Sequence, residues 1–184
     1  MLPARLVALL LVVSALQVLA VGPAVVLYSA GNVAGSAIGS RTQANALCSS
    51  SSLATQVQCS GTTAAFVAYT GDVLVNFPTA YSIPKTLPVK DVNGITLASN
   101  WAALFVRNGA IPYVQYSSAF WTGSTVDGTA VSYGAGNCGG WQSSSASATI
   151  GALASPSVAI GNDVALIQGC SLTFQLMCAC NGTV

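Results

Sequence analysis

Six cysteines constrain this chain more than any other feature of its 184 residues. Their number is even, and they follow an N-terminus typical of a secretory leader, which predicts a disulfide framework formed in an oxidising compartment. The spacing does not favour zinc, because only two of the six lie close together in the sequence. Many pairings are possible, and the sequence by itself leaves the choice open among Cys48, Cys59, Cys138, Cys170, Cys178 and Cys180.

The N-terminus predicts a signal peptide over residues 1–20. Residues 6–16 form an apolar run of suitable length, and Val18 and Ala20 occupy the small-residue positions of a cleavage site. The mature chain is then expected to be one domain, residues 21–184, with a short C-terminal tail. The alternative is an uncleaved anchor, since residues 6–27 are long enough to cross a bilayer. The expected location is secreted, extracellular or on the cell surface, with membrane attachment only if the leader is kept.

The chain is nearly uncharged, with five Lys or Arg, four Asp or Glu and no His. So few cations cannot build a basic patch, which argues against binding of nucleic acid or heparin. The high apolar content of 53% argues against disorder. Removal of the leader also removes Arg5, so the mature chain would carry four cations and four anions. A net charge of zero opposes neither self-association nor assembly with other surface proteins.

No catalytic, metal or cofactor site is expected. The absence of His removes imidazole catalysis. The side-chain carboxylates are the four aspartates Asp72, Asp91, Asp127 and Asp163, and the sequences around Asp91 and Asp127 are typical of turns. The segment Ser82-Ile83-Pro84-Lys85 matches the S-x-x-K pattern of serine acyl-enzymes. That pattern needs a helix, and the prolines around it argue against one, so we interpret the match as chance.

The pattern of apolar, turn and capping residues predicts short strands and few helices. We expect strands at residues 24–28, 64–69, 73–77, 111–116, 164–167 and 172–178, and a hairpin over 89–97 around Asn93-Gly94. A helix is expected within residues 41–53, with Thr42 as a possible N-cap, and helical turns within 100–107. Residues 121–157 predict no element beyond turns and are interpreted as an ordered loop region pinned by a disulfide.

Several short motifs in order along the chain resemble the endostatin-like branch of the C-type-lectin-like fold. They extend from about residue 39 to residue 178, and include the bacterial-type hairpin of endostatin-like surface domains. The matching pieces are Ala44-Asn45-Ala46-Leu47-Cys48, Val92-Asn93-Gly94, Ser99-Asn100-Trp101 with Leu104-Phe105, Trp121-Thr122-Gly123-Ser124, Gly128, Cys138-Gly139-Gly140-Trp141, Cys170 and Cys178.

This resemblance implies an α+β domain with a twisted, mainly antiparallel sheet, two helices and a long disulfide-pinned loop region. It also implies disulfides Cys48–Cys178 and Cys138–Cys170, which leaves Cys59 and Cys180 for each other. The alternative is that Cys178 and Cys180 exchange partners, because residues two apart share one face of a strand. The zinc, heparin and calcium-dependent sugar sites of the family cannot be carried over, because this chain lacks the His, Glu and arginine cluster that form them.

Two features remain open to alternative interpretations. Trp101, Trp121 and Trp141 could stack on sugars, but we interpret them as core residues around the disulfides. Asn181 begins the only Asn-x-Ser/Thr sequon and is a candidate glycosylation site in an accessible tail. The sequence therefore predicts a non-enzymatic, exported structural or surface protein of an extracellular or particle-coating assembly. The alternative is a monomeric adhesin or receptor-like module that binds a glycan or protein.

Overall fold

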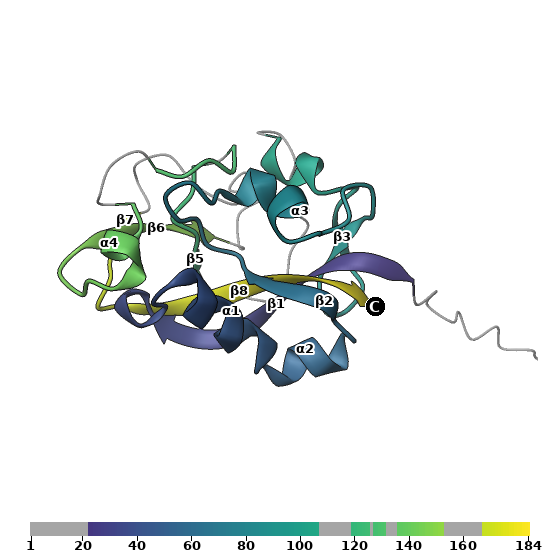
Figure 1. The fold of residues 1–184 in the computed structure, drawn as a ribbon, viewed down its shortest axis with the longest axis horizontal. Helices are drawn as coiled ribbons and strands as arrows, with labels where there is room; N and C mark the ends of the chain where they lie inside the picture. The colour runs from purple at the N-terminus through teal and green to yellow at the C-terminus, as the bar shows by residue number, and fades with distance from the viewer. Residues whose placement is uncertain (1–21, 107–118, 126, 132–135, 153–166) are drawn as a thin grey trace, which may run out of the picture.

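The computed structural model describes residues 22–106, 119–125, 127–131, 136–152 and 167–184, and shows an α+β fold built on a mixed open sheet (Figure 1). The strands are β1 (Pro23–Ala34), β2 (Ser60–Ala65), β3 (Val89–Lys90), β4 (Thr96–Ala98), β5 (Ala119–Trp121), β6 (Ser147–Ala152), β7 (Ile167–Gly169) and β8 (Thr173–Thr183). The helices are α1 (Arg41–Ser49) and α2 (Ser52–Gln56), the single turns α3 (Phe77–Ala80) and α4 (Cys138–Trp141), and the 3-10 turns η1 (Gly35–Ala37), η2 (Leu74–Asn76) and η3 (Ala102–Phe105).

The two long strands β1 and β8 form the centre of the sheet. They run antiparallel from the Pro23–Thr183 pair to the Ala34–Thr173 pair, with an irregularity between Ser29 and Asn32. The strand order is β4-β3-β1-β8-β5-β6-β7, and β2 also pairs with β8. The pairs β1–β3 and β5–β8 are parallel, while the remaining described pairs are antiparallel. The sheet is thus mixed, although antiparallel pairing predominates as expected.

Alternation along the central strands gives the sheet two buried faces. In β8, Leu176, Cys178 and Cys180 belong to one apolar cluster, whereas Met177 and Ala179 belong to the other. Successive residues of a strand point to opposite faces, and β1 divides its side chains in the same way. A strand buried on both faces needs a covering layer on each, and the short helices supply both layers.

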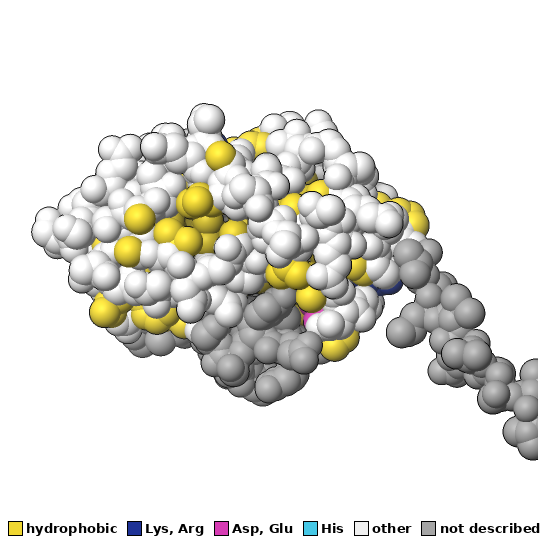
Figure 2. Space-filling view, turned by 90° about the horizontal axis from the view of Figure 1, so that it is seen from below, with side chains coloured by type: hydrophobic (Ala, Val, Ile, Leu, Met, Phe, Trp, Pro, Cys, Tyr) yellow, Lys and Arg dark blue, Asp and Glu magenta, His cyan; other side chains and the backbone are white. Residues whose placement is uncertain are grey.

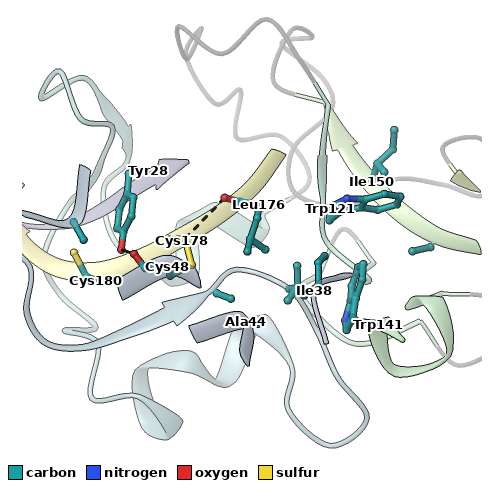
Figure 3. Packing of buried hydrophobic residues seen from close by; sticks show 14 of the residues in the cluster. Tyr28, Ile38, Ala44, Cys48, Trp121, Trp141, Ile150, Leu176, Cys178 and Cys180 are labelled. Atoms are coloured by element: carbon teal, nitrogen blue, oxygen red, sulfur yellow. Dashed lines mark hydrogen bonds between the residues drawn. A yellow bond between two sulfur atoms is a disulfide. The ribbon is translucent and has the colours of Figure 1, made fainter. Parts of the chain in front are cut away.

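One face is covered by α1 and α2 (Figure 1), and α4 contributes Cys138 and Trp141 to the same apolar cluster. Its core contains Ile38, Trp121 and Trp141 beside Leu176 of β8, and Figure 3 shows these side chains pointing into the same space. The indole rings of Trp121 and Trp141 meet edge to face, with centroids 5.9 Å apart. The disulfides lie in this same layer, so covalent links and aromatic packing stabilise one face together.

The other face is covered by η2, α3 and η3. Phe66 meets Phe77 and Trp101 edge to face, with ring centroids 6.2 and 5.7 Å apart. Trp101 also stacks on Phe77, and its indole N–H donates to the carbonyl oxygen of Leu74 at 3.0 Å. The one polar atom of these rings, the indole nitrogen of Trp101, is thus hydrogen-bonded to the backbone of η2, which links η2 to the segment that carries Trp101.

The expected helix within residues 41–53 is present as two helices, α1 and α2. Its N-cap is Ser40, not Thr42 as predicted. The Ser40 hydroxyl accepts from the backbone N–H of Gln43, whose side chain accepts from the backbone N–H of Ser40. This reciprocal capping box satisfies two N–H groups at the helix start, whereas Thr42 lies inside the first turn.

The predicted hairpin over residues 89–97 is confirmed, with β3 and β4 as its strands. Gly94 has φ of +80°, a conformation that glycine adopts without steric cost. The Asp91 carboxylate is fully buried, and its Oδ1 accepts from the backbone N–H groups of Asn93 and Ile95 at 2.9 and 2.8 Å. Asp91 therefore acts in turn formation, as its sequence context predicts.

Other predicted elements differ from the structure. Residues 73–77 were expected as a strand but form η2 and the start of α3, because Leu74 and Phe77 lie three apart and bury the same side of a helical turn. The region 121–157 was expected to lack regular elements, yet it contains α4 and β6. The strand expected at 111–116 lies outside the described residues, as does all of 164–167 except Ile167, which starts β7.

Candidate functional site

Three disulfides join the described cysteines: the two pairs that the family resemblance implies, and the pair that these two leave over. Cys48 of α1 is bonded to Cys178, Cys59 to Cys180, and Cys138 of α4 to Cys170. The first two tie α1 and the end of the α2 segment to neighbouring positions on the same face of β8. Three disulfides are consistent with an oxidising, extracellular environment.

Cys59 differs from the other five cysteines in its exposure. Cys59 is partly exposed as a residue and lines the α2 side of the molecule, whereas the other five are fully buried. Thiol–disulfide exchange requires direct access of an attacking thiolate to a sulfur atom. Cys59–Cys180 is therefore the disulfide that an external thiol can reach first.

The three tryptophans are core residues, which confirms the interpretation from sequence. Trp101, Trp121 and Trp141 are at most 2% exposed. The indole N–H of Trp121 donates to Val33 O at 2.8 Å, and that of Trp141 to Ala68 O at 2.9 Å. Rings buried in this way present no stacking platform to a sugar.

The S-x-x-K match is not part of a helix. Ser82 has φ of +55°, and the chain from Tyr81 to Pro88 is irregular. A Lys one helical turn after the Ser is what the acyl-enzyme pattern requires, and this backbone does not provide it. The structure thus agrees with a chance match.

Asn181 does not lie in a tail, which corrects the expectation from sequence. The sequon Asn181-Gly182-Thr183 belongs to β8, and Asn181 pairs with Val25 on one side and Ser60 on the other. The Thr183 hydroxyl also donates to the Gln58 side chain at 2.9 Å. The apolar pattern of the sequence predicts a strand that ends at residue 178. In the structure β8 continues beyond that residue, because its polar end pairs with β1 and β2.

The most elaborate polar cluster of the described residues surrounds Arg41, at the start of α1. Its Nε donates to Asp72 Oδ2 at 2.7 Å, and the two side chains are only 18% and 24% exposed. The guanidinium carbon lies 4.3 Å from the ring centre of Tyr69, with Phe77 and Tyr81 at 5.2 and 5.4 Å. Aromatic faces attract a cation at such distances, so this Arg is held by rings and by charge.

Arg41 and Asn45 together close the outer edge of β2. The two terminal nitrogens of Arg41 donate to Ala65 O and Val67 O, both at 2.6 Å. Asn45, one turn later on α1, accepts from the backbone N–H of Ala65 at 2.9 Å. In an antiparallel pairing, the N–H and C=O of one residue point to the same side. The α1 side chains therefore occupy the place of a neighbouring strand and block further pairing there.

The cluster perturbs two phenols. Burial raises the pKa of Tyr81 to about 12, and the hydrogen bond that its hydroxyl donates to Asp72 adds to the rise. Burial also raises the pKa of Tyr69 above its ordinary value, and Arg41 partly opposes this. The Tyr69 hydroxyl donates to Gly39 O at 2.7 Å. Neither phenol is poised to ionise near neutral pH, so this cluster has the character of a structural network.

Sequence reasoning did not foresee the Arg41 cluster. One usable signal was the spacing of Arg41 and Asn45, which places both on one side of a helix. Their partner Asp72 lies 31 residues from Arg41 in the sequence, and only folding brings it close.

Folding removes charge from the described surface. Six charged side chains lie among the described residues, since Arg5, Arg107 and Asp163 fall outside them. Arg41 and Asp72 neutralise each other, and Asp91 is buried. The remaining three are Lys85, Lys90 and Asp127. The Asp127 carboxylate accepts from the Thr125 and Thr129 side chains, and these hydrogen bonds lower its pKa.

Two open hollows flank α1, each of about 470 Å³. The η1 hollow is lined by Ala37, Gln43, Ala46, Leu47 and Ser50. The α2 hollow is lined by Ser49, Ala54, Thr55, Gln58, Cys59, Gly61 and Thr63. Neither contains a charged side chain. Figure 2 shows this lower side of the molecule, where the described side chains are almost all apolar or uncharged polar.

Within the described residues, no group of three or more His, Cys, Asp or Glu is placed to hold a metal ion. None of the helices in the described part of the chain is long and apolar enough to cross a membrane.

No protein-family model matches this chain, and no curated protein matches it in sequence.

Proposed function

We propose that this chain is a non-enzymatic, exported structural domain that self-associates or is built into an extracellular, cell-surface or particle-coating assembly. The observation that carries the proposal is the scarcity of charge on the described surface, where Lys85, Lys90 and Asp127 are the charged groups left after pairing and burial. Soluble monomers ordinarily keep a charged surface, because charge opposes association. An uncharged surface loses little solvation when it is covered.

Two further features support a structural role over a catalytic one. In the Arg41 cluster, the guanidinium donates its hydrogen bonds to the Asp72 carboxylate and to the backbone carbonyls of Ala65 and Val67. These contacts stabilise the fold and leave the guanidinium engaged within the protein. Two disulfides tie Cys48 of α1 and Cys59 to the central strand β8, which suits a domain that must persist outside the cell. We further propose that the domain is endostatin-like within the C-type-lectin-like class, a proposal supported by the nested disulfides and the buried tryptophans.

The α2 hollow favours a second candidate, a monomeric adhesin or receptor-like module. Its Ser49, Thr55, Gln58 and Thr63 side chains are neutral hydrogen-bonding groups, which suit a neutral glycan or peptide. The burial of all three tryptophans weighs against a glycan, because no indole is available there for stacking.

Light scattering on the oxidised, deglycosylated protein without residues 1–20 tests the proposal. We expect concentration-dependent association that changes little between low and high salt, because few charges are available for screening. A stable monomer at high concentration in every salt would support the ligand-binding module instead. Electron microscopy of the native material, either in a layer, filament or particle or free in the medium, provides an independent check.

A further inference from the structure

The single turn α4 is left-handed. Its four residues, Cys138 to Trp141, have φ of +54°, +59°, +77° and +66° in chain order. Among the described residues, positive φ occurs at consecutive positions only here. Gly139 and Gly140 adopt such values freely, whereas a Cβ makes them unfavourable at Cys138 and Trp141. Contacts from outside the turn must therefore impose this backbone.

The first strained residue, Cys138, is held by a covalent bond. It is fully buried and bonded to Cys170, which lies between β7 and β8. The Cys170 carbonyl oxygen accepts from the backbone N–H of Ser36 at 3.0 Å, which ties this segment to η1. A Cβ added at Gly35 would lie only 2.7 Å from the Cys138 sulfur. The disulfide thus fixes the start of α4 against closely packed backbone.

The last strained residue, Trp141, is held by its ring and its backbone. Its indole N–H donates to Ala68 O, and its carbonyl oxygen accepts from the backbone N–H of Gly39 at 2.9 Å. A Cβ added at Gly123 would lie 2.7 Å from the indole, so the ring fills its site beside Trp121 without spare room (Figure 3). The hand of the turn sets the direction of the Cα–Cβ bond, so the ring reaches this site only from the left-handed backbone.

We propose that the Cys138–Cys170 disulfide is a redox switch that sets the hand of α4 and thereby places Trp141 in the core. With both cysteines reduced, no bond opposes the backbone preference of Cys138, and α4 relaxes out of the left-handed region. The indole of Trp141 then leaves its site beside Trp121. This face of the domain is completed only in an oxidising compartment. The inference goes beyond the proposed assembly role and does not depend on it.

Closure of the switch uses an external disulfide as the oxidant. One cysteine thiolate attacks a sulfur of that disulfide, and the other sulfur leaves as a thiolate. The second cysteine then attacks the mixed disulfide, so that the Cys138–Cys170 bond forms and the external disulfide becomes a dithiol that carries the two thiol protons. An external dithiol reverses these steps, and it does so after opening Cys59–Cys180, because Cys138 and Cys170 are fully buried.

The experiment removes the disulfide with and without a residue that tolerates the left-handed turn. Cys138→Ala with Cys170→Ala removes the bond and keeps a Cβ at residue 138. Cys138→Gly with Cys170→Ala removes the same bond but lets residue 138 adopt positive φ freely. Nuclear magnetic resonance measures solvent exchange of the indole N–H groups, which reports local opening around Trp141. Trp101 is the internal control, because its indole N–H is bonded on the other face of the sheet.

We expect exchange at Trp141 to become about tenfold faster or more in the Ala variant, and several-fold less accelerated in the Gly variant. Exchange at Trp101 should stay within about twofold in both, because local opening leaves the rest of the fold intact. Equal acceleration in the two variants would overturn the role of the turn's hand. Unchanged exchange at Trp141, or equal acceleration at Trp101, would overturn the switch.

A second pair of variants keeps all three disulfides and decides the matter if the first pair fails to fold. Gly140→Ala tests the hand of the turn alone, because Gly140 has φ of +77° and an added Cβ would meet no atom within 4 Å. Gly169→Ala is the matched control, since Gly169 lies beside Cys170 without a positive φ and with equally open space. We expect Gly140→Ala alone to accelerate exchange at Trp141, by about fivefold or more. Equal effects of the two substitutions would reject the proposal.

Discussion

Arg41 donates from its guanidinium to the carbonyl oxygen of Ala65 across 2.6 Å, and so closes the open edge of strand β2 with a helix side chain. Exposed strand edges invite pairing with other chains, and proteins cover them in several ways. Arg41 also forms an ion pair with Asp72 and lies over the ring of Tyr69. One side chain therefore covers the strand edge, neutralises a carboxylate and packs against aromatic rings.

Replacement of Arg41 by Met should lower the free energy of unfolding by about 2–3 kcal/mol, because it removes the ion pair of the partly buried Asp72 carboxylate and one hydrogen-bond donor from each of the Ala65 and Val67 carbonyls. Arg41→Lys should lose less, since it keeps the charge near Asp72 but cannot reach both carbonyls at once. Urea denaturation measures both. Equal stability of all three proteins would show that the cluster adds nothing to the fold.

The disulfide Cys59–Cys180 should be the first to open under limiting reductant. Cys59 is partly exposed at the α2 hollow, while Cys48, Cys138, Cys170 and Cys178 are fully buried. Differential alkylation followed by peptide mapping identifies the first thiols to appear. Earlier labelling of Cys138 and Cys170 would contradict this order.

Glycosylation of Asn181 stays a prediction, and its position in β8 sets a condition on it. Asn181 pairs on both sides, so a transferase must act before β8 joins the sheet. In a eukaryotic secretory host, Cys59→Ser should raise the fraction of glycosylated chains, because it delays fixation of this strand end and leaves the sequon intact. The mass shift removed by N-glycosidase measures this fraction. A lower or equal fraction in the variant would contradict competition with folding.

Stability should fall at alkaline pH between about 10 and 12. Burial raises the pKa of Tyr28 to about 12 in the folded protein, and that of Tyr81 also to about 12. The unfolded chain ionises near the ordinary value of 10.0 and so loses protons first. The contribution of these phenols is fully present below pH 10 and is lost as the pH rises toward 12. Urea midpoints measured against pH give the slope, and Tyr81→Phe should reduce it.

Cleavage after Ala20 should remove residues 1–20 from the native protein. The described fold begins close to that point, since Gly22 donates its backbone N–H to Val184 O at 3.3 Å and β1 starts at Pro23. Intact-mass measurement of protein isolated from its own source provides the test. A mass that includes Met1 would favour the retained anchor.

The sequence by itself determined the local features of this protein. The Asn93-Gly94 hairpin, the helix around Ala44 and Cys48, and the first strand of the sheet follow from backbone preferences and apolar spacing within a few residues. The burial of the tryptophans also follows, because each indole buries a large apolar area and a domain of this size needs such side chains in its core.

Only the tertiary structure decided how distant segments meet. Residues 73–77 look like a strand in isolation, but Leu74 and Phe77 gain more by packing as a helical turn against Trp101. The polar sequon at Asn181 becomes strand because β1 and β2 lie on either side of it. Arg41 contacts Asp72 and the edge of β2, which lie far from it in the sequence, and no local sequence pattern predicts these contacts. Long-range contacts of this kind depend on the chain closing on itself, which short-range preferences do not specify.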